Sequence, residues 1–241
     1  MVWQYTPYTV PLLLVGIGTA ITSIVVWMYR AKVFSTVIAS ISVWSFAQAL
    51  QLSMVPYEWK LFWMYVVTVS AFMLTASVFV FTLDYTGRYE WMTFRRLLPI
   101  GAVGSLIVIF VWTNSLHNLI WQDIELVQSG SVAMLDYTWG PGVWLIVLPA
   151  YSLLLASVAL LVPLLLHSRR IYRKQTTFIV AGIGLPWMAH VTTMLGYSPF
   201  PHMTLTPLVN SFSGILVFIG VFGYDFVGTA PKARDIVVNK L

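Results

Sequence analysis

The sequence contains no cysteine and very few charged residues, and both absences narrow what the protein can do. Without cysteine it forms no disulfides, thiolate metal sites or thiol nucleophiles. Only 9% of the 241 residues are charged, whereas soluble domains usually carry about 25%. So little charge does not cover a water-facing surface. With 59% hydrophobic residues, the composition predicts a membrane protein.

Seven apolar runs are long enough to cross a bilayer as helices, which takes about 20 residues each. Runs such as LIVIFVW do not alternate as the strands of a β-barrel do. The longest gap, residues 117–141, leaves no room for a soluble domain. The sequence therefore predicts an all-α, polytopic membrane protein, with a seven-transmembrane helix bundle over residues 1–229. The predicted spans are roughly 9–29, 33–55, 61–84, 97–116, 142–167, 176–196 and 208–228.

Lysine and arginine are concentrated in alternate connections between the spans. Twelve of the 13 follow spans 1, 3, 5 or 7, and only Lys60 lies on the other side. Because positive residues stay cytoplasmic, we expect a multi-pass protein of the cell membrane with its N-terminus outside and its C-terminus in the cytoplasm. The net charge of +5 then indicates topology and contact with anionic membrane lipids, not nucleic-acid binding.

Polar side chains inside the spans are informative because hydrocarbon penalises them. With the predicted orientation, almost all of them lie in the outer half of the bilayer. One interpretation is a pocket that is open to the outside and binds a small ligand. The other is that these residues pair between helices and only stabilise the bundle. The candidates for the ligand pocket are Gln48, Gln51, Thr68, Asn114, Tyr151, Trp187, His190 and Asn210.

A second group of residues lies where a conformational change could pass through the membrane. DYTGR ends the third span, with Gly87 as a candidate helix C-cap. A proline in the sixth span removes a backbone donor and is expected to kink the helix. The alternative for the residues at the inner ends is a structural belt. The candidates for signal transmission are Asp84, Pro186, Tyr224, Asp225 and Pro231.

Several catalytic and cofactor classes lack the residues they need. The last span has no lysine for a retinal Schiff base, and no HExxH zinc motif occurs. His190 is the only histidine well inside a span, so a haem held by two histidines lacks one ligand. We therefore expect neither an enzyme nor a cofactor. A small transporter or permease-like protein remains an alternative, as does a membrane anchor without a ligand; uptake into liposomes would favour the transporter.

Several motifs follow one another in a fixed order along the chain. They are DYTGR after the third span, HNLIW after the fourth, WGPGVWLIVLPAYS at the start of the fifth, LPW in the sixth and FGYDFVGTAPKARDIVV at the end. This ordered set resembles the seven-transmembrane N-terminal region of archaeal and bacterial histidine kinases, over nearly the whole chain.

The resemblance implies a sensory input region that detects an external or membrane-borne stimulus. The region would pass a conformational change through span 7 to a cytoplasmic kinase or PAS module, in the same longer chain or in trans. A phosphoacceptor histidine and an ATP-binding lobe are absent from these 241 residues, so the resemblance does not extend to kinase activity. It also supplies no binding residues.

The charged segment at residues 230–241, APKARDIVVNKL, is predicted to begin a signalling helix. Pro231 suits the first position of a helix. Ala230, Ala233, Val237 and Leu241 share one face at helical spacing. With the resemblance, this face predicts a linker that pairs with its copy in a homodimer. The alternative is a short amphipathic tail that lies on the membrane.

Overall fold

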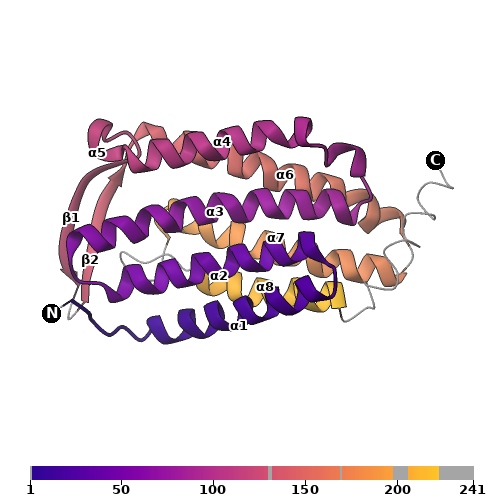
Figure 1. The fold of residues 1–241 in the computed structure, drawn as a ribbon, viewed down its shortest axis with the longest axis horizontal. Coiled ribbons are helices and arrows are strands. Elements are labelled where there is room, and N and C mark those ends of the chain that lie inside the picture. Colours follow the sequence, from indigo (N-terminus) through magenta and orange to yellow (C-terminus); the bar gives the residue numbers. More distant parts are fainter. Residues whose placement is uncertain (1, 130–131, 169, 198–205, 223–241) are drawn as a thin grey trace.

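The computed structural model describes residues 2–129, 132–168, 170–197 and 206–222. It is mostly helical, and the long helices run side by side along the longest axis of the molecule (Figure 1). These helices are α1 (Thr9–Met28), α2 (Lys32–Ser53), α3 (Tyr57–Tyr85), α4 (Phe94–Trp112), α6 (Trp144–His167), α7 (Arg170–Met194) and α8 (Thr206–Phe222). The shorter elements are η1 (Tyr89–Trp91), α5 (Asn114–His117), β1 (Trp121–Ser129), β2 (Val132–Trp139) and η2 (Pro141–Val143).

Six helices of the described residues are long and apolar enough to cross a membrane: α1, α2, α3, α4, α6 and α7. Helices suit this task because they satisfy their backbone groups internally. The outer faces of α1 and α4 expose large apolar side chains such as Leu14, Ile21 and Leu106, as expected of surfaces in contact with lipid. The chain is therefore a multi-pass membrane protein.

The predicted C-cap at Gly87 is confirmed. This residue has a φ of +71°, a conformation that glycine adopts without steric cost. Its N–H donates to the carbonyl of Asp84 at 3.1 Å, and the N–H of Arg88 donates to the carbonyl of Leu83 at 2.9 Å. This pair of bonds is a Schellman motif. It ends α3 within DYTGR and turns the chain towards α4.

Five helices close into a ring. Helix α3 packs against α2 and α6, α6 packs against α7, α7 against α8, and α8 returns to α2. Helix α1 lies outside this ring against α2 and α8, and α4 lies outside it against α3 and α6. Buried residues from four helices of the ring meet in one cluster, including Ile41, Val78, Leu161 and Ile183.

The all-α prediction is wrong for the connection between α5 and α6. Strands β1 and β2 pair antiparallel there and form a hairpin across one end of the bundle (Figure 1). Period-two alternation would have revealed a half-buried strand, but the buried residues of β2 are Ala133, Met134 and Leu135 in succession. The base of the hairpin depends on Gly140 and Gly142, since a Cβ on either would collide with the carbonyl of Leu119.

Each of the last four carbonyls of α2 accepts a hydrogen bond. These bonds hold the N-terminal segment and the start of α3 against the end of α2, beside the hairpin. Such carbonyls lack partners inside their own helix. The carbonyl of Leu50 accepts from the N–H of Met54, and that of Ser53 accepts from the backbone N–H of Gln4. The Gln4 carboxamide donates to the carbonyl of Leu52 at 2.7 Å, and the Lys60 ammonium donates to the carbonyl of Gln51 at 2.9 Å.

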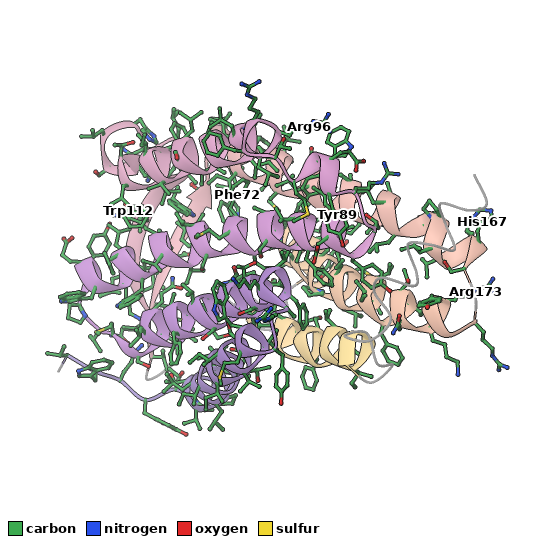
Figure 2. The ribbon with its side chains drawn as sticks, turned by 45° about the vertical axis from the view of Figure 1, so that its right-hand side comes forward. Phe72, Tyr89, Arg96, Trp112, His167 and Arg173 are labelled. Atoms are coloured by element: carbon green, nitrogen blue, oxygen red, sulfur yellow. The ribbon has the colours of Figure 1, made fainter. Side chains whose placement is uncertain are left out.

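The two ends of the bundle differ in charge. The connections α1–α2, α3–α4 and α6–α7 all lie at the end opposite the hairpin (Figure 1). Figure 2 shows Arg96, His167 and Arg173 toward this end and Trp112 toward the hairpin end. The predicted clustering of basic residues at alternate connections therefore corresponds to one end of the folded molecule. We call it the basic end, and the opposite one the hairpin end.

Candidate functional site

A cavity of about 310 Å³ lies inside the ring of α2, α3, α6, α7 and α8. The hairpin contributes to its wall at one end through Trp121, Leu135, Tyr137 and Trp139. No residue of α4 contributes to the wall, and α1 contributes only Leu12. The volume falls within the range of about 300–1,000 Å³ typical of small-molecule sites.

Two predicted residues of α2 share one wall of this cavity. Gln48 and Gln51 lie one helical turn apart, and the Nε2 group of Gln48 donates to Oε1 of Gln51 at 2.9 Å. Among the described residues, the Nε2 group of Gln51 has no hydrogen-bond acceptor, so it remains a donor toward the cavity that both side chains line.

A second polar group joins α6 to α7. The hydroxyl of Tyr151 is hydrogen-bonded to Nδ1 of His190 at 2.7 Å, and it donates to the sulfur of Met194 at 3.9 Å. The Tyr151 ring meets the Trp187 ring edge to face, with centroids 5.7 Å apart. All four residues line the cavity. Trp187, His190 and Met194 therefore lie on the face of α7 that points toward the cavity and contacts α6.

Helix α8 adds polar atoms that lack partners. The side chains of Thr206 and Asn210 are buried, with 3% and 5% of their surface exposed. Among the described residues, neither the Thr206 hydroxyl nor the Asn210 Nδ2 group has a hydrogen-bond partner. Buried polar groups are nearly always paired, so two unpaired ones in a cavity wall indicate a place where a ligand or water binds.

The remaining two predicted pocket residues differ in position. Thr68 lines the cavity, and its hydroxyl donates to the carbonyl of Met64 at 3.0 Å within α3. Asn114 lies outside the cavity and is fully buried at the base of the hairpin. Its carboxamide accepts from the N–H of Ile120 at 3.0 Å and donates to the carbonyl of Trp121 at 3.0 Å. Asn114 therefore holds the start of β1.

Lys60 is the cavity residue that the sequence reasoning missed. The third span was predicted to begin at residue 61, which left Lys60 in an external connection. Helix α3 begins at Tyr57 instead, so Lys60 lies in its first turn. Its side chain turns inward, 2% exposed, and lines the cavity. The sequence did contain a feature that could have identified it: Lys60 is the one basic residue on its side of the predicted topology.

The hairpin residues were also missed, since no strand was expected. Tyr137 of β2 is the most informative of them. Burial, assisted by the nearby charge of Asp136, raises the pKa of Tyr137 to about 12. The Tyr137 hydroxyl, which is neutral at physiological pH even at its ordinary pKa, therefore holds its proton more firmly still, and the residue lines the cavity at this end.

The residues predicted to transmit a signal are only partly within the described chain. Pro186 lies inside α7 and lines the cavity. Asp84 is half-buried in the last turn of α3. Tyr224, Asp225 and Pro231 lie outside the described residues. Within the described ranges, no three histidine or acidic side chains gather as they would around a metal ion.

Fold and site together define a class: a multi-pass helical membrane protein with an internal cavity that is polar near one end. The family model described as the N-terminal 7TM region of histidine kinase matches residues 11–231. The chain therefore belongs to this family of sensor regions, as the ordered motifs indicated. A search of curated proteins found no match. The family is a sensory input region of histidine kinases, which associates with a kinase signalling module and a membrane.

Proposed function

We propose that this chain is a seven-span sensor whose cavity receives a small ligand and whose α8, as span 7, transmits the ligand's presence to the cytoplasm. One observation carries the proposal. Helix α8 forms a wall of the cavity through Asn210, Ser213 and Val217, and it directly precedes residues 223–241 in the chain. A molecule in the cavity would therefore contact the helix that leads to the predicted linker.

A ligand shifts a conformational equilibrium only by binding one state better than the other. The two packings would differ at the contact between α7 and α8. At Gly182 the two backbones approach so closely that a Cβ would collide with the Val217 side chain. Pro186 has no N–H, so the Gly182 carbonyl lacks its usual donor four residues on. Helix α7 is thus weakened where α8 approaches it, and both residues line the cavity.

The charges of the two ends support an orientation. Exposed acidic residues, among them Asp123 and Glu125, occupy the hairpin, whereas Arg96 and Arg173 lie toward the opposite end. By the positive-inside rule, the hairpin and the N-terminus face outward and the C-terminus faces the cytoplasm. Residues 230–241 would then begin the linker to a kinase or PAS module, paired with the same segment of a second copy.

A disulfide lock between α7 and α8 tests the proposal. The chain has no cysteine, so Gly182→Cys with Val217→Cys introduces a single possible bridge at a contact of suitable closeness. The locked chain, fused to a histidine-kinase core in membranes, is expected to lose ligand-dependent change in autophosphorylation. Reduction of the disulfide should restore it.

The matched control locks two helices that are not expected to move relative to each other. Ser23→Cys with Ser35→Cys joins α1 to α2 where the two hydroxyl oxygens lie 2.9 Å apart. This lock should leave regulation intact. Full regulation with α7 and α8 locked would contradict the proposal, because a signal would then pass without movement at that contact.

A further inference from the structure

Lys60 is a buried cation without an anionic partner. Only 2% of its surface is exposed, and among the described residues its ammonium group bonds only to the carbonyl of Gln51, at 2.9 Å. An ammonium group has three donors, so two remain. Buried charges are normally paired, because desolvating an unpaired charge is expensive. The side chain lines the cavity, and so the cavity is where a compensating anion would bind.

The groups beside Lys60 suit an anion as well. Within the described part of the chain, the Nε2 group of Gln51 in the same wall has no acceptor, and Tyr137 lines the cavity at the hairpin end. Each is a neutral donor that would bond to an anionic oxygen, and bonds to charged oxygens are the stronger kind. No acidic side chain lines the cavity within the described residues, so nothing there repels an anion.

The cavity is elongated, and its part toward the basic end is lined mainly by apolar side chains. It reaches the buried side chains of Phe34, Val37, Ile38 and Val78, toward the basic end. Lys60 and Val78 lie roughly 27 Å apart along α3 at 1.5 Å per residue. A volume of about 310 Å³ spread over such a length is narrow. Its shape therefore suits an extended chain.

We infer that the cavity binds an amphiphile with one anionic head, a carboxylate or a phosphate, and a single apolar chain. The head bonds to Lys60 and Gln51 near the hairpin, and the chain lies between α2, α3 and α8. This inference rests on the proposed function, since it names the ligand class of the same cavity. Contact of the chain with α8 is what would couple binding to that helix.

Three probes of equal chain length test the inference: decanoate, 1-decanol and decylamine. Their equilibrium binding is measured on the purified chain in nanodiscs of zwitterionic lipid, with empty nanodiscs as the blank. Decanoate is expected to bind at least ten-fold more tightly than decanol, and decylamine more weakly than either. Equal binding of decanoate and decanol, or tightest binding of decylamine, would overturn the inference without any variant being made.

The variant Lys60→Met removes the charged ammonium group and keeps an unbranched side chain that is one atom shorter. It should abolish the preference for decanoate while decanol binding stays within about two-fold. If Lys60 only capped α2, its loss would weaken both probes together and leave their ratio unchanged, which would contradict the inference. Lys174→Met, which removes an exposed cation of α7, is the control and should keep the wild-type ratio.

A further arm identifies the source of the anion. Nanodiscs that contain lysophosphatidylglycerol, a membrane lipid with one phosphate head and one chain, either displace decanoate, which assigns the head to a membrane lipid, or leave it bound, which assigns it to a free amphiphile. Both results retain the same head chemistry. Because the assay has no kinase readout, failure to bind decanoate leaves the α7–α8 lock to test the proposed function separately.

Discussion

At the scale of single residues, Gln4 joins three parts of the hairpin end. Its carboxamide donates to the carbonyls of Leu52 and Ala133 and accepts from the N–H of Ala133 at 2.8 Å. Gln4→Ala leaves these backbone groups unpaired, and each unpaired buried group costs about 1–3 kcal/mol. We expect faster hydrogen exchange at Ala133 and a free energy of unfolding lowered by at least this amount.

The control for that variant is Gln128→Ala in the same hairpin. Gln128 is exposed, and an exposed substitution away from such contacts usually changes stability by less than about 0.5 kcal/mol. Equal effects of the two substitutions would show that the Gln4 contacts do not hold the hairpin.

His190 and Asn210 carry a second prediction, because they line the cavity from α7 and α8. His190→Ala removes the 2.7 Å bond to Tyr151, and Asn210→Ala removes an unpaired buried donor. Both should alter the response of a kinase fusion to an external stimulus while membrane insertion stays normal. An unchanged dose–response curve in both variants would remove the cavity from the signalling account.

Polar residues inside predicted spans proved a useful guide to the cavity, but they could not say which side chains turn inward. Seven of the eight predicted pocket residues line the cavity, and Asn114 does not. Asn114 follows a turn at Thr113 that ends α4, and no local pattern marks this break. Lys60 was not predicted as a pocket residue, because sequence patterns locate the end of a span only to within a few residues. A shift of one helical turn decides whether the Lys60 ammonium group reaches water or the cavity.

At the scale of elements, the contact between α7 and α8 depends on one glycine. A Cβ at Gly182 would collide with the Val217 side chain and press on the Ser213 carbonyl, whereas Gly184 has open space around it. Gly182→Ala should therefore destabilise the bundle by about 1–3 kcal/mol, as overpacking usually does. Gly184→Ala should be neutral or stabilise by up to about 1 kcal/mol, from helix propensity.

Thermal unfolding in the same detergent checks both substitutions. A Gly182→Ala variant as stable as Gly184→Ala would show that α7 and α8 are not in tight contact, and the proposed transmission would lose its physical basis.

The helices were predictable from composition because a long apolar run has few other options in a membrane. The hairpin was not. The burial of β2 does not alternate, and the pairing of the two strands is irregular between Gln122 and Glu125. The hairpin is held by contacts between residues that are separated in the sequence. These are the hydrogen bonds of the Gln4 and Asn114 carboxamides and the close approach of Gly140 to Leu119. Such contacts become visible only once the helices are placed.

At the scale of the whole molecule, the account requires opposite ends to face opposite compartments. A single cysteine at Gln128 in the hairpin should react with an impermeant maleimide added to intact cells. A cysteine at Tyr89, which is exposed beside α4 at the basic end, should react only after the membrane is opened. Labelling of the Tyr89 position alone in intact cells would show the opposite topology. Labelling of both positions would contradict a topology in which the two ends face different compartments.

The central claim is that occupancy of the cavity moves α8 relative to the rest of the bundle. Paired spin labels test it directly in the cysteine-free chain, at Tyr89→Cys and Ile219→Cys, both exposed positions. With decanoate bound, and its occupancy measured on the same sample, the account predicts a changed distance distribution for this pair. A control pair at Tyr89→Cys and Tyr29→Cys should keep its distribution. An unchanged distance between residues 89 and 219 at full occupancy would contradict the account.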